Sequence, residues 1–209
     1  MKNNIQTKSQ VEQLPLMESF LTLQGEGFHT GKLAYFIRLG GCDVGCVWCD
    51  VKESWDAEKH PFSTVSDITK SAIESKSEIV VITGGEPLMY DLGGLTDQLQ
   101  HAGLNTHIET SGVYPLSGQW DWVCFSPKKF KPPREEFYDR SNELKVIVFN
   151  KSDLKWAEEH AQKMQNDALL YLQPEWSKRK AMTPLIIDYI KRNPKWRISL
   201  QVHKYMNIP

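Results

Sequence analysis

Short apolar runs alternate with amphipathic segments along most of the chain. The run LAYFIRL at 33–39 is apolar almost throughout, which favours a strand buried on both faces. Apolar residues at helical spacing predict a helix over 64–76, and Ser63 and Thr64 both offer hydroxyls to cap its first turn. The same reading predicts strands at 20–27, 33–41, 79–87, 105–112, 121–127, 143–150, 168–175 and 196–204, and further helices at 92–102, 153–166 and 183–192.

Strands that alternate with helices predict βαβ units and a mainly parallel α/β sheet. Four of the predicted strands run into polar or glycine-rich loops, with the sequences GGCDVGC, TGGEP, ETSG and SPK. Parallel α/β folds bind their ligands at the carboxyl ends of the strands. We therefore expect these four loops to meet at one rim and to form the functional site there.

Three of the four cysteines lie within eight residues, as Cys42, Cys46 and Cys49 in a C-x3-C-x2-C pattern. A [4Fe–4S] cluster needs a ligand on each of four irons, so three thiolates leave one iron open to a small molecule. A zinc site is the main chemical alternative, but it would want a fourth protein ligand. The next Cys or His is His60, eleven residues on, which is not finger-like spacing. The spacing therefore favours the cluster.

Cys124 lies in the apolar run DWVCFS, and two readings of it stay open. As a fourth iron ligand it would make the cluster an electron carrier with no open iron. As a free cysteine in a strand it would be a buried core thiol, which is the commoner case.

Composition and charge narrow the function classes. The chain has 209 residues with 25 basic and 26 acidic side chains, so its net charge is −1 and no basic surface for nucleic acid is indicated. No stretch approaches the roughly 20 apolar residues of a membrane helix, and the start of the chain lacks an apolar signal core. We expect an N-terminal arm at 1–15, a single domain at 16–209, a cytoplasmic location, and neither nucleic acid nor membrane as a partner.

Three stretches resemble one enzyme family: FLTLQGEGFHTGKLAYFIRLGGCDVGCVWCD, VVITGGEP and WRISLQVHKYMNIP. The first carries a cysteine loop similar to that of the radical S-adenosylmethionine superfamily, and all three together resemble the 7-carboxy-7-deazaguanine synthases. The resemblance implies a short partial (β/α) barrel that acts as a homodimer with a [4Fe–4S] cluster and S-adenosylmethionine. It also implies conversion of 6-carboxy-5,6,7,8-tetrahydropterin to 7-carboxy-7-deazaguanine, with loss of ammonia, in queuosine or other 7-deazapurine biosynthesis. An electron donor such as flavodoxin or ferredoxin would reduce the cluster.

The resemblance also implies a set of site residues. The implied pterin contacts are Leu23, Gln24, Gly25, Glu26, Arg38, Thr83, His203 and Pro209, the last through a terminal carboxylate. The implied adenosylmethionine contacts are Trp48, Cys49, Asp50, Gly84, Gly85, Glu86, Glu109, Ser126, Pro127, Lys128, Gln173, Pro174, Glu175 and Trp176.

One position departs from the family pattern, and two other functions remain in view. The family commonly has Thr after the CD dipeptide as a Mg²⁺ ligand, but this chain has Val51, which offers no side-chain oxygen. The ion must therefore lose that ligand, take a water or backbone oxygen, or be absent. A glycyl-radical enzyme activase would share the cysteine spacing but would not explain LQGEG or the HKY ending. A non-catalytic iron–sulfur electron carrier would need Cys124 as fourth ligand.

Overall fold

The computed structural model describes residues 13–165 and 167–209. Nine strands of this part of the chain form one open sheet in the order β3-β1-β2-β4-β5-β6-β7-β8-β9. All neighbours from β2 to β9 are parallel, whereas β1 pairs antiparallel with β2 and with β3. The strands are β1 Gln13–Leu23, β2 Leu33–Leu39, β3 Phe62–Thr64, β4 Ile79–Gly84, β5 Asn105–Thr110, β6 Trp122–Phe125, β7 Glu143–Val148, β8 Leu169–Pro174 and β9 Trp196–Ile198. The predicted mainly parallel α/β sheet is confirmed.

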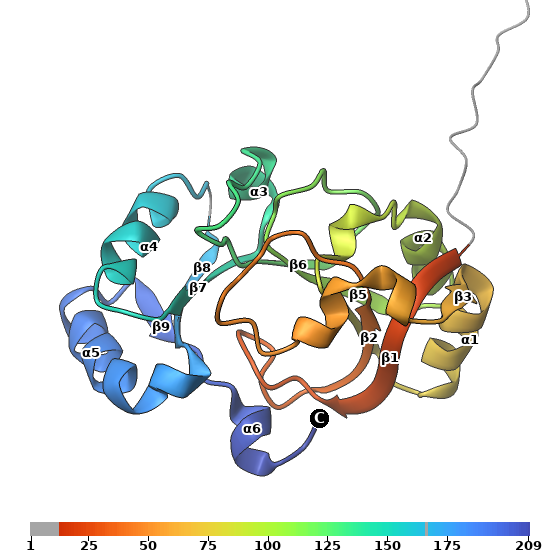
Figure 1. The fold of residues 1–209 in the computed structure, drawn as a ribbon, viewed down its shortest axis with the longest axis horizontal. Coiled ribbons are helices and arrows are strands. Elements are labelled where there is room, and N and C mark those ends of the chain that lie inside the picture. The colour runs from red at the N-terminus through yellow and green to blue at the C-terminus, as the bar shows by residue number, and fades with distance from the viewer. Residues whose placement is uncertain (1–12, 166) are drawn as a thin grey trace, which may run out of the picture.

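Helices lie around the outside of the curved sheet, and the loop of residues 40–51 crosses its front (Figure 1). This loop, the cysteine loop, leaves the carboxyl end of β2 and carries three cysteines. The helices are α1 Val65–Glu74, α2 Gly93–His101, α3 Glu136–Arg140, α4 Asp153–Ala161, α5 Arg179–Arg192 and α6 Val202–Met206. The described residues contain no helix of the length and apolar character that a bilayer crossing requires.

The parallel strands present two chemically different faces. Outward-facing Ile82, Ile108 and Leu144 are fully buried against helix residues such as Leu95 and Leu99, which forms the main core. Successive side chains of a strand point to opposite faces. Residues on the inner face of the same strands therefore form a second set, and those near the carboxyl ends line a cavity: Arg38, Thr83, Glu109, Lys145 and Gln173.

Residues typical of helix caps lie at the start of α1 and after the end of α2. Of the two predicted caps of α1, Thr64 has the role: its hydroxyl accepts a hydrogen bond from the Asp67 amide at 3.1 Å. Gly103 follows α2 with φ of 80°, the left-handed conformation that suits a residue just past a helix end.

Other predicted bounds are wrong. The closing strand was expected at 196–204, but only Trp196–Ile198 pairs with β8, and the following residues form α6. Helix α5 was expected at 183–192 but begins at Arg179, so Pro184 lies inside it. The start of α5 is set instead by Glu175, whose carboxylate accepts hydrogen bonds from the Ser177 and Lys178 amides in the preceding 3₁₀ turn.

The end of the predicted N-terminal arm, residues 13–15, is a strand and not an arm. β1 begins at Gln13, and Leu14 is fully buried, so residues 13–15 belong to the sheet. The rest of the predicted arm lies outside the described residues. Strand β3 and helix α3 were not predicted, because each is short and carries little periodic signal.

Candidate active site

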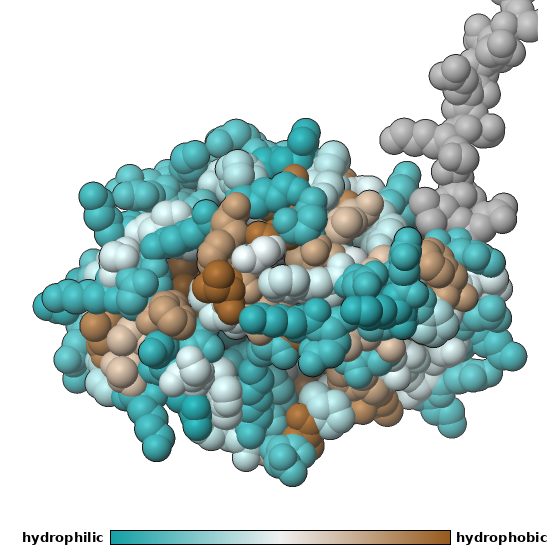
Figure 2. Space-filling model, viewed as in Figure 1, coloured by the Kyte–Doolittle hydropathy of each residue, from teal (hydrophilic) through white to brown (hydrophobic). Residues whose placement is uncertain are grey.

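A cavity of about 510 Å³ opens at the carboxyl ends of the parallel strands. Figure 2 views this face, where paler and brown side chains gather near the centre among teal ones. The cavity is lined by the predicted pterin contacts Leu23, Gln24, Gly25, Glu26, Arg38, Thr83, His203 and Pro209. It is also lined by the predicted cofactor contacts Trp48, Cys49, Asp50, Gly84, Gly85, Glu86, Glu109, Ser126, Lys128, Gln173, Pro174, Glu175 and Trp176. Of the predicted residues only Pro127, between two lining residues, does not line it.

The three loop cysteines all face this cavity. Backbone hydrogen bonds hold the loop at Gly41 and Cys42: the Gly41 amide donates to the Ser54 carbonyl at 2.6 Å, and the Cys42 amide donates to the Trp55 carbonyl at 3.1 Å. Burial raises the pKa of the Cys46 thiol to about 11, although the nearby Lys128 charge opposes that rise. Thiolates are the form that binds metal, so cluster binding must displace protons here.

The cysteine geometry suits a cluster better than a single ion. Across residues 13–165 and 167–209, no three His, Cys, Asp or Glu side chains lie close enough to hold one metal ion. Zinc would need its ligands at about 2.3 Å for sulfur, hence close to one another, whereas the irons of a cube are bound one thiolate apiece. Three thiolates around an open cavity therefore fit a [4Fe–4S] cluster with one accessible iron.

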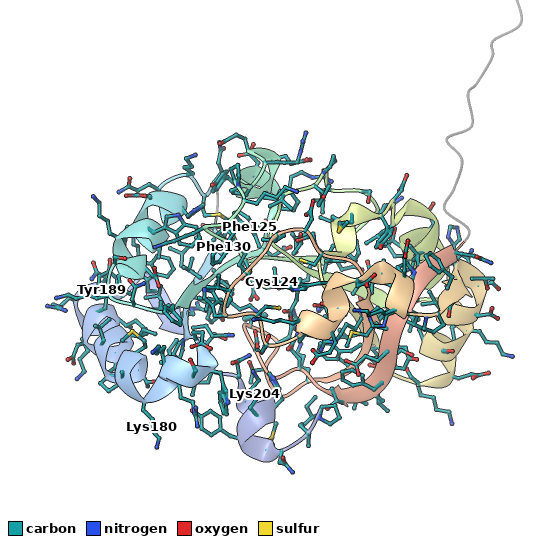
Figure 3. The ribbon with its side chains drawn as sticks, viewed as in Figure 1. Cys124, Phe125, Phe130, Lys180, Tyr189 and Lys204 are labelled. Atoms are coloured by element: carbon teal, nitrogen blue, oxygen red, sulfur yellow. The ribbon has the colours of Figure 1, made fainter. Side chains whose placement is uncertain are left out.

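Cys124 does not join the other cysteines. Its side chain is 3% exposed, does not line the cavity, and lies on the inner face of β6 behind the cysteine loop (Figure 3). Burial raises its pKa well above the usual range, and the nearby Glu143 carboxylate adds to that rise. A neutral buried thiol is the packing role that sequence reasoning preferred.

The TGGEP loop lines the cavity and also packs closely against the cysteine loop. The Gly85 amide donates to the Leu39 carbonyl at 3.0 Å, and the Glu86 amide donates to the Gly41 carbonyl at 2.9 Å. A Cβ on Gly85 would lie 2.2 Å from the Gly41 oxygen and 2.6 Å from the Cys42 Cβ. The glycine is therefore needed for close contact with the cysteine loop.

Glu86 ties the TGGEP loop to the loop after β5. Its carboxylate accepts hydrogen bonds from the Thr110 hydroxyl at 2.6 Å, the Ser111 amide at 2.8 Å, and the Ser111 hydroxyl. It also caps the short 3₁₀ turn that follows through the Leu88 amide at 3.2 Å. Because these oxygens are engaged within the protein, the structure gives Glu86 a positioning role in addition to its place on the cavity wall.

Lys128 and Trp48 form the wall beside the cysteines. The Lys128 ammonium lies 5.9 Å from the centre of the Trp48 ring and donates to the Ser126 carbonyl at 2.6 Å and to its hydroxyl at 2.5 Å. Burial lowers the pKa of Lys128, while the neighbouring Cys46 raises it. A cation here suits the carboxylate of an amino-acid ligand.

A buried ionic network lies deeper in the cavity, and sequence reasoning missed its cation. Lys145 is 2% exposed and donates to Glu26 at 2.5 Å and to Glu109 at 3.1 Å. The Gln24 amide donates to Glu109 at 3.0 Å, and the Gln201 amide donates to Glu26 at 3.0 Å. Burial raises the pKa of Glu26, but the charge and hydrogen bond of Lys145 outweigh it and lower the pKa to about 2. The sequence signal was available, because Lys145 alternates with apolar residues in ELKVIV.

Arg38 lies on the opposite side of the substrate region. Its Nε donates to Glu18 at 2.6 Å, and its side chain is 20% exposed. Within the described residues its two terminal nitrogens make no hydrogen bond, so a bidentate pair with a ligand carboxylate remains open to them. The cavity thus has a cationic side at Arg38 and a net negative side at Glu26 and Glu109.

The last residues of the described chain close one side of the cavity (Figure 3 labels Lys204 on α6). The Val202 amide donates to the Gly25 carbonyl at 2.9 Å, and the His203 ring packs where a Cβ on Gly25 would lie. Lys204 pairs with Asp50 of the cysteine loop at 2.5 Å. Further along, the Thr22 hydroxyl donates to a Pro209 main-chain oxygen at 3.3 Å.

This fold and site define a radical S-adenosylmethionine enzyme: an open, mainly parallel barrel with a three-cysteine loop after its first parallel strand. The Radical SAM superfamily model matches residues 36–132, which include that loop. A 7-carboxy-7-deazaguanine synthase of Flavobacterium psychrophilum is 58% identical, over 95% of this chain and 94% of the relative. The synthase of Escherichia coli K12 is 39% identical, over 94% and 99%. The chain belongs to the 7-carboxy-7-deazaguanine synthase family.

A comparison with solved structures supports the same family membership. The crystal structure of QueE from Escherichia coli matches with a TM-score of 0.80 at 35% identity, covering 91% of this chain and 95% of that one.

The close contact at Gly85 yields a prediction. Gly85→Ala should push the TGGEP loop off the cysteine loop, with an overpacking cost of about 1–3 kcal/mol and loss of most bound iron. Gly93→Ala is the matched control, because a Cβ there meets only the Asp91 side chain at 3.2 Å. Iron per chain and chemical unfolding of both variants measure the difference. Normal iron content in Gly85→Ala would show that the loop contact does not shape the cluster site.

Proposed function

We propose that this protein converts 6-carboxy-5,6,7,8-tetrahydropterin to 7-carboxy-7-deazaguanine with loss of ammonia, in queuosine or other 7-deazapurine biosynthesis. The single observation that carries the proposal is the cavity, which joins the three cysteines to a polar pocket with an anionic and a cationic side. A carboxypterin offers N–H donors at one end and a carboxylate at the other, which matches that polarity. The names of the relatives support the same reaction and disfavour a glycyl-radical activase.

The proposed cofactors are a [4Fe–4S] cluster on Cys42, Cys46 and Cys49, and S-adenosylmethionine beside it. When bound, the cluster supplies the electron that cleaves adenosylmethionine and so starts hydrogen abstraction from the substrate. The chain's own residues bind and orient: Lys128 meets the adenosylmethionine carboxylate, and Arg38 meets the carboxylate of the pterin. The enclosing residues exclude water from the reacting atoms. A homodimer in the cytoplasm, reduced by flavodoxin or ferredoxin, completes the proposal.

The direct test is product formation by anaerobically reconstituted protein. With adenosylmethionine, carboxypterin and a chemical reductant, mass spectrometry should detect 7-carboxy-7-deazaguanine. Cys42→Ala, Cys46→Ala and Cys49→Ala should each lose the cluster absorbance and the product, because two remaining thiolates hold a cube poorly. Cys124→Ala is the matched control and should keep both, since Cys124 lies off the cavity. A cluster that needs Cys124 would instead support the electron-carrier function.

Magnesium has a weaker basis in this chain. Val51 lines the cavity but has no side-chain oxygen, and its carbonyl already accepts from the Ser54 amide at 3.1 Å and the Ser54 hydroxyl at 2.7 Å. That backbone oxygen is therefore a poor substitute for a threonine hydroxyl in an octahedral shell. We propose that any Mg²⁺ here is held by the substrate and water more than by the protein.

A titration of Mg²⁺ into metal-stripped enzyme tests this. Val51→Thr should show a larger stimulation of turnover by Mg²⁺ than the native protein, because the hydroxyl restores one ligand. Val51→Ala controls for the loss of the branched apolar side chain and should behave like the native protein. Greater stimulation in the native protein than in Val51→Thr would refute the proposal.

A further inference from the structure

The buried cation Lys145 joins two carboxylates that arrive from different parts of the chain. Glu26 comes from the loop after β1, and Glu109 from the end of β5, while Lys145 lies on the inner face of β7. The ammonium touches Glu26 at 2.5 Å and Glu109 at 3.1 Å, and all three side chains line the cavity. The network therefore faces the space where a ligand would bind.

Stability alone is a poor reason for such a network. Removing ions from water costs several kcal/mol apiece, and apolar residues of the same volume often hold a fold as well. The carboxylates also keep unused capacity, because each oxygen has two acceptor positions. Of Glu26, one oxygen is bound by Lys145 and the other by Gln201; of Glu109, one by Lys145 and the other by Gln24. Acceptor positions remain for N–H groups in the cavity.

The charge balance depends on Lys145. Two carboxylates that share a low-dielectric site repel each other, and without a cation one of them takes up a proton. A protonated carboxyl has lost its charge and presents an O–H donor at one of its acceptor positions. The other charged or titratable groups around this network are Asp50, Cys124, Glu143, His203 and Lys204, with Lys128 further along the wall. Among residues 13–165 and 167–209, Lys145 alone is a cation in hydrogen-bond contact with both carboxylates.

We propose that Lys145 is a positioning residue that keeps Glu26 and Glu109 ionised together, so that the pair accepts the 2-amino group and adjacent ring N–H of the substrate. The inference rests on the proposed function and deepens it, because it states what selects an aminopyrimidinone ring. Under this inference Glu109 contacts the substrate, whereas the family resemblance implied that it contacts adenosylmethionine. Sites built to bond an N–H group reject analogues that lack it, since their buried acceptors are then left unpaired.

The first measurement uses the native enzyme and needs no variant. The 2-oxo analogue, 6-carboxy-5,6,7,8-tetrahydrolumazine, replaces the 2-amino group by an oxygen that faces the carboxylates. Hydrogen bonds to charged groups are worth about 10- to 100-fold each, so the analogue should bind at least about 10-fold more weakly than carboxypterin. Its inhibition constant, compared with the Kd of carboxypterin from calorimetry, gives the ratio. Equal binding of the two compounds would overturn the inference.

The second measurement uses Lys145→Met, which keeps the length of the side chain and removes its charge. We expect KM for carboxypterin to rise about 100-fold while iron content and adenosylmethionine cleavage without substrate stay at native levels. The variant KM should fall as pH rises, because two carboxylates without Lys145 share a proton that they lose at higher pH, whereas the native KM should change less with pH. Lys145→Arg should restore part of the binding by returning the charge.

Matched variants distinguish the effect of losing a charge in this network from the effect of losing a lysine charge elsewhere in the protein. Lys129→Met removes a cation that pairs with Asp153 at 2.5 Å. Neither of these residues lines the cavity, so KM for carboxypterin should not change. Glu109→Gln should weaken pterin binding and leave adenosylmethionine binding intact; the reverse result would return Glu109 to the cofactor and overturn the inference. If Lys145→Met does not fold, the inference is still tested by Glu109→Gln and by the ratio of analogue binding to carboxypterin binding in the native enzyme. Absence of any deazaguanine from native enzyme would instead refute the proposed function.

Discussion

The contact between the cysteine loop and the TGGEP loop is the constraint on which the rest of the site depends. The Glu86 amide donates to Gly41 of the cysteine loop, the Gly85 amide donates to Leu39 at the end of β2, and Gly85 allows the main chains of the two loops to touch. Glu86 then extends the contact to the loop after β5 through Thr110 and Ser111. Three strand ends are thereby fixed as one unit. Thiolates must be held in defined positions before they can bind a cluster, and backbone packing of this kind supplies that rigidity.

The chemistry of the cavity follows from the two-residue period of the strands. One face of the sheet carries the apolar core, and the other carries a sequence of polar side chains from β2 to β8. Arg38, Glu109 and Lys145 lie on the inner faces of β2, β5 and β7, so strands and not loops place these charges around the cavity. Groups held on strands keep their geometry better than groups on loops.

Local signals predicted much of this from the sequence. The Thr64 cap, the cysteine spacing and the glycine loop each depend on neighbouring residues, and the resemblance carried the residue set that the cavity brings together. Long-range contacts were not visible. The alternation in WRISLQVHK predicted a strand through 204, but after Ile198 no partner strand continues, and Val202 binds the Gly25 carbonyl instead. The partners of Glu86 and Lys145 lie far away in sequence for the same reason.

The segment of residues 201–209, which includes α6, packs against the cavity, so ligand binding in the cavity is linked to the docking of this segment. Gln201 and Lys204 reach across to Glu26 and Asp50, so the segment contacts both halves of the site. Any ligand that touches the docked segment binds that arrangement more tightly than an undocked one. Thermodynamic reciprocity then requires that the ligand hold the segment in place by the same factor. The same coupling free energy therefore sets how much docking of α6 strengthens ligand binding and how much a bound ligand stabilises the docked α6.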